Sequence, residues 1–259
     1  MIAMCTCISF AIDKGGTGKT TSTGNVAACL AKMGKKVLMI DLDHQADLSD
    51  WYGQDVTTQY HVGRMLLGEL SFQEILVNIS DNLDLIPSSK ENDKIEKLLV
   101  AERGAEGRLK RNIEKNGLRE MYDYILMDCP KGLGNFTTNG VVASDFYIVP
   151  VKPEYFDYKG IEFFQKHIQE IIDSGLNDHL QLLGILITRY NLNQKNNVKK
   201  ATAEKIRESA LPVFETIIRD NSPLIEAVIN GCSIFEQNPH SNGAKDYQSL
   251  TKEILALTS

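Results

Sequence analysis

The amino-acid sequence predicts an α/β fold built on a doubly wound, mostly parallel sheet. Short apolar, β-rich runs alternate with helical stretches along the whole chain, and a glycine-rich loop joins the first run to the first helical stretch. The 259 residues, 42% hydrophobic and 24% charged, are typical of a globular protein with a large core. Because no proline-rich linker or repeat divides the chain, we expect one domain over residues 1–259.

The predicted strands are the apolar runs. Several are apolar nearly throughout (VLMI, YILM, LLGILI), which is typical of parallel strands covered on both faces. We expect strands at residues 5–12, 36–41, 83–87, 124–128, 145–150, 182–188 and 213–218. Helices are expected at residues 20–33, 95–116, 161–174, 198–210 and 243–256. The charged stretch 95–117, interrupted by Gly104 and Gly107, fits either a solvated helix pair or a surface for a partner.

The strongest functional signal is DKGGTGKTT, residues 13–21, between the first predicted strand and the first predicted helix. Glycines let successive backbone N–H groups point at phosphate oxygens, and the helix N-terminus adds positive potential. The segment therefore predicts a P-loop NTPase. Lys19 is expected to reach the β- and γ-phosphates of ATP, and the Thr20 hydroxyl to ligate Mg²⁺. The residues expected to bind ATP here are Lys14, Gly15, Gly16, Thr17, Gly18, Lys19, Thr20 and Thr21.

Acidic residues follow two further predicted strands. Asp41 and Asp43 come at the end of the second strand, and Asp128 ends the run YILMD in the form of a Walker B motif. The carboxyl ends of parallel strands meet at one edge of the sheet, where ligands bind in open α/β folds. We therefore expect Asp128 to hold Mg²⁺ through a water, with Asp43 as a further metal-site residue beside Thr20.

The KGGxGKT form of the loop resembles the deviant Walker A motif of the ParA/MinD group. The resemblance implies that Lys14 reaches across a dimer interface to the partner's nucleotide, so that Lys14 joins Lys19 as a catalytic cation. MIDLDHQADLS, residues 39–49, is similar to the DxDPQGN region of that family, with alanine and aspartate in place of the Gly-Asn pair. By this resemblance, Asp43 positions the attacking water. Lys131 departs from the pattern after the Walker B motif, and its effect on hydrolysis or on a partner stays open.

The resemblance continues over nearly the whole chain and is closest to ParA. VPVKPEYF (149–156) and GILITRY (184–190) are similar to ParA segments, and they suggest Pro153 and Arg189 as neighbours of the adenine and ribose. A ParA-type protein is an ATP hydrolase with slow intrinsic turnover. The resemblance implies an ATP-dependent homodimer that binds nonspecific double-stranded DNA and is released when a ParB-like centromere-binding adaptor stimulates hydrolysis. It also implies a cytoplasmic protein that associates with the nucleoid in its ATP state.

A basic stretch offers a candidate DNA surface. Residues 189–219 hold seven basic residues and three acids, although the chain carries a net charge of −6. We expect phosphate contacts from Lys195, Lys199, Lys200 and Arg219, which would make binding salt-dependent and independent of sequence. A charge-rich exposed helix is the alternative explanation. Family members often have Pro-Arg-Asn where this chain has Arg219-Asp220-Asn221, which places an acid beside the expected cation.

Other functions remain as alternatives. One alternative is a MinD-like or orphan positioning ATPase, which would act on a membrane or on a protein assembly. A helix that binds a membrane surface would be basic, but residues 246–256 carry only one lysine, so we expect no membrane partner. A redox ATPase would need a second cysteine beside Cys129, and a small-molecule kinase or ligase would need a substrate pocket. A nucleotide-gated binding module without turnover is the last alternative. The five cysteines are expected to be buried, reduced thiols, with Cys5 and Cys7 on one strand face.

Overall fold

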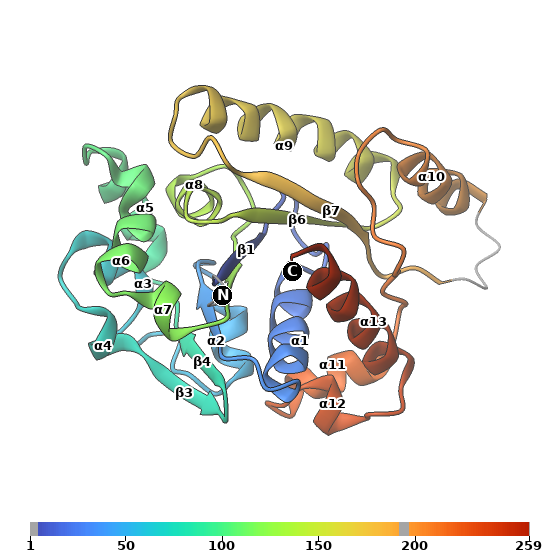
Figure 1. Ribbon diagram of the computed structural model, residues 1–259, viewed down its shortest axis with the longest axis horizontal. Coiled ribbons are helices and arrows are strands. Elements are labelled where there is room, and N and C mark those ends of the chain that lie inside the picture. The colour runs from blue at the N-terminus through green and yellow to red at the C-terminus, as the bar shows by residue number, and fades with distance from the viewer. Residues whose placement is uncertain (1–4, 192–196, 259) are drawn as a thin grey trace.

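A seven-stranded sheet forms the centre of the protein (Figure 1). The computed structural model describes residues 5–191 and 197–258. The strands lie in the order β3-β4-β2-β5-β1-β6-β7. β3 pairs antiparallel with β4, and the other pairings in the sheet are parallel, which confirms the predicted fold class. The strand bounds are β1 Thr6–Phe10, β2 Val37–Asp41, β3 Val77–Ser80, β4 Leu83–Ile86, β5 Tyr124–Asp128, β6 Phe146–Val151 and β7 Gln181–Ile187.

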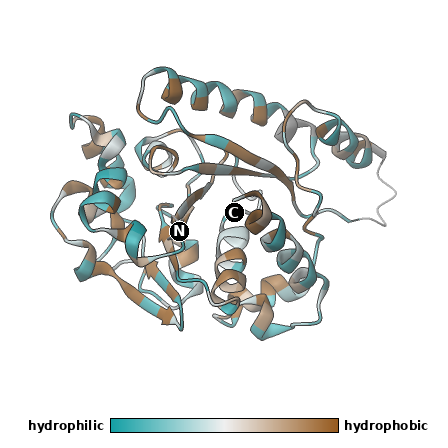
Figure 2. Cartoon of the chain, in the orientation of Figure 1, coloured by the Kyte–Doolittle hydropathy of each residue, from teal (hydrophilic) through white to brown (hydrophobic). Residues whose placement is uncertain are grey.

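Helices cover both faces of this sheet and create two cores. Successive side chains of a strand point to opposite faces, so each central strand contributes residues to both cores. In β1, Cys7 belongs to one core, and Ile8 and Phe10 belong to the other. Figure 2 shows hydrophobic residues concentrated along the strands and hydrophilic residues on the outward helix surfaces. The core of Ile8 and Phe10 lies under α1 (Lys19–Lys32), α2 (Asp47–Trp51), α11 (Ser222–Ile229), α12 (Ile234–Gln237) and α13 (Asn242–Leu257).

The core that contains Cys7 lies under the remaining helices. They are α3 (Val62–Leu67), α4 (Phe72–Ile75), α5 (Asn92–Val100), α6 (Arg108–Lys115), α7 (Leu118–Met121), α8 (Asn135–Val142), α9 (Tyr155–Asp173) and α10 (Asn197–Arg207). Cys5 belongs to the same core, as its spacing from Cys7 predicted. Cys5, Cys7, Cys29 and Cys129 are buried, and Cys232 is partly buried. In the described part of the chain, no helix has both the length and the apolar composition of a membrane span.

The predicted strand at residues 213–218 is wrong. This segment forms only isolated bridges, Ile185 with Val213 and Tyr190 with Arg219. Between these bridges the backbone N–H groups of Glu215 and Thr216 donate to the Glu253 carboxylate of α13, at 3.0 and 2.8 Å. Because the Glu253 carboxylate accepts from these two N–H groups, the segment does not form a continuous row of strand hydrogen bonds with β7.

Two further differences concern regions of low apolar content. The single helix expected at residues 95–116 is broken into α5, a 3₁₀ turn at Ala105–Gly107, and α6, because Gly104 takes a left-handed conformation with φ of 64°. The short edge strand β3 and the short helices α2, α3, α4, α7, α8, α11 and α12 were not predicted, because segments of four to eight residues are too short to show a clear period. α9 also begins at Tyr155, six residues before the predicted start.

The sheet register brings the predicted acidic residues together. Asp41 at the end of β2 lies opposite Asp128 at the end of β5, and Phe10 at the end of β1 lies opposite Asp128 on its other side. The phosphate loop that follows β1 therefore begins beside both carboxylates. This arrangement fixes the candidate site at the carboxyl edge of the sheet.

Candidate nucleotide site

The phosphate loop runs from β1 to the start of α1. Gly16 and Gly18 have φ values of 68° and 92°, which other residues rarely adopt. A Cβ on Gly18 would lie 3.5 Å from the Thr188 methyl group, so the loop also passes close to the end of β7. The Thr188 hydroxyl fixes this approach by donating to the Thr17 carbonyl at 2.6 Å. The loop is therefore held from the neighbouring strand as well as by its own turn.

Lys19 is buried beneath this loop. Its ammonium donates to the Lys14 carbonyl at 2.8 Å and lies 3.4 Å from the Ile12 carbonyl. Burial lowers the pKa of Lys19, and the negative charge of Asp128 acts in the opposite direction. A buried ammonium whose hydrogen bonds go to backbone carbonyls keeps its positive charge close to the cavity, which suits an anionic ligand such as a phosphate.

Asp128 is also buried, close enough to Lys19 for their charges to interact. Neither carboxylate oxygen has a hydrogen-bond partner among the described residues. Burial raises the pKa of Asp128 well above its usual range and the charge of Asp41 adds to this, whereas the Thr20 hydroxyl and Lys19 lower it. A buried carboxylate with vacant lone pairs beside a threonine hydroxyl is a set of hard oxygen donors that fits Mg²⁺. Thr20 and Asp128 would hold that ion.

Asp41 and Asp43 have different tasks. Asp41 is fully buried; its carboxylate accepts from the Ser49 hydroxyl at 2.6 Å, the Ser49 N–H at 2.9 Å and the Asp43 N–H at 3.1 Å. Burial raises the pKa of Asp41 to about 7. The Asp43 side chain instead lines the cavity and accepts from the Gln45 N–H at 2.9 Å. Asp41 therefore holds the loop, and Asp43 lines the cavity.

The departure at Ala46 has a structural consequence. Ala46 has φ of 58° and precedes the first residue of α2, at the position where the related family has glycine. A left-handed conformation costs a residue with a Cβ roughly 1–2 kcal/mol. The loop after Asp43 is therefore held in its conformation against local strain.

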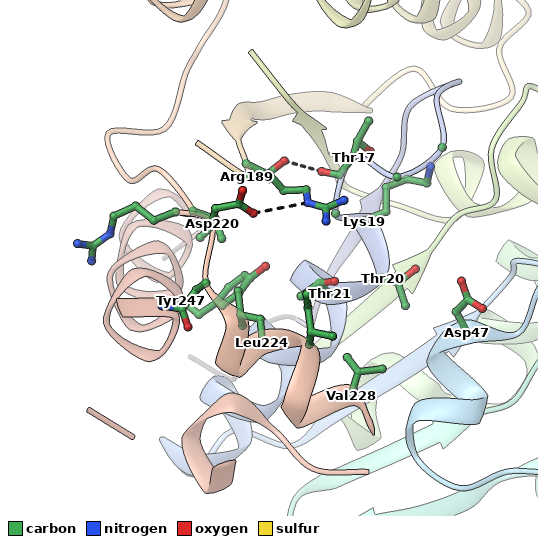
Figure 3. Close-up of a pocket in the computed structure, with 18 of the residues that line it drawn as sticks. Thr17, Lys19, Thr20, Thr21, Asp47, Arg189, Asp220, Leu224, Val228 and Tyr247 are labelled. Atoms are coloured by element: carbon green, nitrogen blue, oxygen red, sulfur yellow. Dashed lines mark hydrogen bonds and ion pairs between the residues drawn. The ribbon is translucent and has the colours of Figure 1, made fainter. Parts of the chain in front are cut away.

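A cavity of about 810 Å³ opens in front of these residues (Figure 3). One wall is the phosphate loop with Asp43 and Lys131. The opposite wall is apolar and comes from α11, with Leu224 and Val228 facing the cavity, and Tyr247 of α13 lies behind it. A polar wall beside an apolar wall suits a ligand with phosphates at one end and a flat ring at the other.

The predicted neighbours of the adenine and ribose separate in the structure. Arg189 lines the cavity, has φ of 51°, and lies with its Nε 3.9 Å from an Asp220 oxygen. Pro153 is buried at the end of β6 and does not belong to the lining of this cavity. Lys14 also lies outside the lining: the carbons of its side chain run along Gly160 of α9, at 3.6–3.7 Å from the position of a Cβ there.

The three predicted DNA-contacting residues that the structure describes belong to two different segments. Lys195 lies outside the described residues, whereas Lys199 and Lys200 lie on α10, with Lys199 3.7 Å from a Glu154 oxygen. Arg219 instead lines the nucleotide cavity, and its guanidinium donates to the Asp246 carboxylate at 2.6–3.1 Å. Arg219 is therefore already held by a carboxylate.

Sequence reasoning missed the α11 wall and the polar side chains around it. The segment Asn221-Ser222-Pro223 carried a usable signal, because an asparagine followed by a proline in the first turn marks a helix start. No local pattern could place that helix beside the phosphate loop. The cavity residues absent from the predicted set are Gln45, Asp47, Thr188, Ile218, Asp220, Asn221, Ser222, Leu224, Ile225, Val228, Ile229 and Tyr247; Lys131 was noted without a role.

Known proteins share this fold and much of this sequence. The AAA domain family matches residues 5–182. The sporulation initiation inhibitor protein Soj of Bacillus subtilis is 33% identical over 252 residues, covering 96% of this chain and 98% of that protein. The chromosome-partitioning ATPase Soj of Thermus thermophilus is 34% identical over 249 residues, covering 96% and 95%.

A solved structure shares the fold of this chain and contains a bound nucleotide and a metal ion. A cobyrinic acid a,c-diamide synthase from Mycobacterium smegmatis, solved with ADP and magnesium, superposes with a TM-score of 0.83 at 28% identity, covering 97% of this chain and 94% of that one. Its bound nucleotide and metal agree with the donor set of the phosphate loop, Thr20 and Asp128. ATP and Mg²⁺ are therefore the ligands of this site, and the chain belongs to the ParA/Soj family of partition ATPases, P-loop enzymes that hydrolyse ATP.

Proposed function

We propose that this ATPase works as a nucleotide-dependent DNA switch. Two subunits close around ATP, the closed dimer binds nonspecific double-stranded DNA, and hydrolysis stimulated by a ParB-like adaptor releases it. The observation that carries the proposal is the site itself: a buried Lys19 and an unpartnered Asp128 lie under the phosphate loop, while Lys14 lies outside the cavity. The partitioning names belong to sequence relatives at 33–34% identity, whereas the synthase is a 28% identical structure, which favours partition over amide synthesis.

Within one subunit, each residue has a separate role in hydrolysis. The Lys19 ammonium would exchange its carbonyl acceptors for the β- and γ-phosphates, and Asp128 with Thr20 would hold Mg²⁺, which neutralises developing phosphate charge when bound. Asp43 would orient the attacking water from the loop that Asp41 holds. Turnover by the isolated protein would be slow, because the ATP state has to last until the adaptor arrives.

Lys14 is assigned to the partner's nucleotide. Its side chain runs along α9 and outside the cavity of its own subunit, which supports a contact with the nucleotide of a second subunit. A cation supplied in trans accelerates related phosphoryl transfers by about 10³–10⁵-fold. We expect Lys14→Ala to keep ATP binding but to lose most ATP hydrolysis and ATP-dependent dimerisation, measured by phosphate release and light scattering. Normal turnover by a dimeric Lys14→Ala protein would contradict the trans role.

The DNA surface is assigned to α10 and its preceding segment. Lys199 and Lys200 of α10 remain the candidates within the described residues, with Lys195 beside them in the sequence. The pairing of Arg219 with Asp246 reduces its availability, so we expect a smaller contribution from Arg219. In this proposal the protein is cytoplasmic and joins the nucleoid only in its ATP state.

The decisive experiment is binding to a nonspecific duplex with ATP, ADP or no nucleotide across a salt series. ATP-dependent binding that weakens steeply with salt is expected. In a dimer, Lys199→Glu/Lys200→Glu removes four phosphate contacts and should lower the log–log salt slope by about 3–4. Lys94→Glu/Lys97→Glu on α5 is the matched control, because it changes the net charge equally at an exposed surface.

A negative result would favour the alternative. If ATP drives dimerisation but no nucleotide state binds DNA, the protein is better explained as a MinD-like or orphan positioning ATPase acting on a membrane or a protein assembly. If the α10 and α5 double variants lose the same amount of DNA affinity, the net charge of the protein, rather than the α10 surface, governs DNA binding.

A further inference from the structure

The first turn of α5 reaches two segments of the nucleotide site. Asn92 and Glu96 are four residues apart, so they lie on the same face of the helix. Asn92 is fully buried and points toward the loop of Asp43, whereas Glu96 contacts the start of α8, just after the segment that follows Asp128. The outward face of the same helix, with Lys94, Lys97 and Leu98, is exposed.

A chain of buried hydrogen bonds joins Asn92 to the backbone of Asp43. The Asn92 amide donates to the Ser88 hydroxyl at 2.8 Å, and that hydroxyl donates to the Asp43 carbonyl at 2.6 Å. The Ser88 N–H donates to the Ser49 hydroxyl at 2.8 Å, which in turn donates to Asp41. Ser49, Ser88 and Asn92 have no exposed surface, so water does not compete for these bonds.

The position of Asn92 is fixed by close packing. A Cβ at Gly63 of α3 would lie 3.0 Å from the Asn92 Cγ and closer still to its Oδ1. Asn92 therefore has no room to swing away from Ser88 on that side. The Asp43 carbonyl is tied to a rigid helix through one intervening side chain.

Glu96 joins the same helix to the other segment. Its carboxylate accepts from the backbone N–H groups of Asn135 and Phe136, the second at 3.2 Å. These are the first N–H groups of α8, where a negative charge is favourable because the helix has no internal acceptor for them. A Cβ on Gly134 would lie 3.0 Å from the Glu96 Cδ and closer to Oε1, so the turn before α8 is fitted to this carboxylate.

The segment between Asp128 and α8 also touches the phosphate loop. The Gly132 N–H donates to the Asp13 carbonyl at 3.0 Å, and the Thr137 hydroxyl of α8 donates to the Gly132 carbonyl at 2.9 Å. A shift of α8 would therefore move Gly132, which contacts the start of the phosphate loop at Asp13. Through Asn92 and Glu96, α5 sets the distance between this segment and Asp43.

We propose that Asn92 and Glu96 are positioning residues for ATP hydrolysis. They do not line the nucleotide cavity; they hold the Asp43 loop and the segment after Asp128 at a fixed separation. The inference rests on the proposed function in one respect, the role of Asp43 in orienting water. Because Asn92 and Glu96 do not line the cavity, and Lys19 is held by the Ile12 and Lys14 carbonyls, loss of the α5 contacts should slow hydrolysis much more than it weakens ATP binding.

The test compares kcat with the Kd for ATP in Asn92→Ala, Glu96→Ala and the double variant of the full chain. A misplacement of about 1 Å at a catalytic group costs on the order of 100-fold in rate. We expect kcat to fall about 10- to 100-fold in each single variant, with the Kd for ATP within about threefold of the original. The double variant should be little slower than the worse single variant, because residues that act as a unit are not additive. Asp93→Ala on the exposed face of α5 is the matched control and should change neither constant.

Two smaller changes keep the test valid if an alanine variant fails to fold. Ser88→Ala removes the hydroxyl that bridges Asn92 to Asp43, and Glu96→Gln keeps the shape of the side chain but removes its charge; both should lower kcat at least about threefold. Asp43→Ala separates the two hypotheses. If Asp43→Ala abolishes hydrolysis while the Asn92, Ser88 and Glu96 variants keep kcat within about twofold, the positioning role is overturned. If Asp43→Ala retains full kcat, the proposed role of Asp43 fails instead.

Discussion

Replacing Gly24 by alanine is expected to destabilise the protein, although alanine is the better helix former. Gly24 lies inside α1 and is buried against Trp51, the only tryptophan of the chain. A Cβ on Gly24 would lie 2.8 Å from the Trp51 Cη2, 3.0 Å from Cε3 and closer still to Cζ3. Trp51 is 2% exposed, and its indole N–H donates to the Cys232 carbonyl at 2.9 Å, so the ring has little room to retreat.

Two opposing contributions set the magnitude. Overpacking a well-packed core costs about 1–3 kcal/mol, whereas alanine gains about 1 kcal/mol over glycine inside a helix. The net loss for Gly24→Ala is therefore about 1 kcal/mol. In a Trp51→Leu background the ring is absent, and the same Gly24→Ala change should stabilise the protein by up to about 1 kcal/mol. The effect of one substitution thus changes sign with the residue at position 51.

The assay is urea unfolding followed by circular dichroism, which works with and without the tryptophan. For a chain of this size, 1 kcal/mol corresponds to a change in Tm of about 2–4 °C. The same free-energy change for Gly24→Ala in both backgrounds would refute the contact between Gly24 and Trp51. The result bears on the site, because this contact sets the spacing between α1, which follows the phosphate loop, and α2, which follows the loop of Asp43.

Three further predictions test the loops of the site. Ala46→Gly should raise the free energy of unfolding by about 0.5–1 kcal/mol, because glycine adopts the left-handed conformation without strain; an unchanged or lower value in urea unfolding would show that the strain is absent. Burial raises the pKa of Asp41 from 3.8 to about 7, so the nucleotide-free folded protein holds a proton that the unfolded chain releases. The free energy of unfolding should therefore fall as the pH rises from 3.8 to about 7, and Asp41→Asn should make this dependence on pH less steep. An equal dependence on pH in both proteins would contradict the raised pKa of Asp41. Asp128→Asn removes a buried carboxyl group whose pKa is raised, so at alkaline pH it should raise Tm without nucleotide and abolish Mg²⁺-dependent hydrolysis; a lower Tm would mean that the Asp128 charge is already well compensated by Lys19.

Much of the fold follows from local pattern. The central strands were predicted because parallel strands covered on both faces leave continuous apolar runs, and β1, β2, β5, β6 and β7 lie where those runs are. The 213–218 segment shows the limit of this reasoning. Its composition is that of a strand, but Glu253, far along the sequence, accepts its backbone N–H groups. A strand exists only where a neighbouring strand supplies hydrogen-bond partners, and composition does not reveal that neighbour.

The phosphate end of the site was also open to prediction. The residues that hold phosphate and metal come from short contiguous segments at strand ends, so spacing alone placed Lys19, Asp43 and Asp128 at one edge. Arg219 illustrates the opposite case. Its basic neighbours suggested a DNA contact, but its guanidinium is held by Asp246 and lines the nucleotide cavity.

The sequence by itself determined the alternation of the main strands and helices, the phosphate loop and the acids around it, because these depend on residues close together in the chain. Only the tertiary structure decided that α11 forms the apolar wall of the cavity and that Asn92 and Glu96 connect the loop of Asp43 with α8. Such contacts join residues far apart in the chain, 39 positions between Asn135 and Glu96 and 45 between Ser88 and Asp43. The reason is physical: a local pattern records which face of an element is buried, but packing decides what it is buried against.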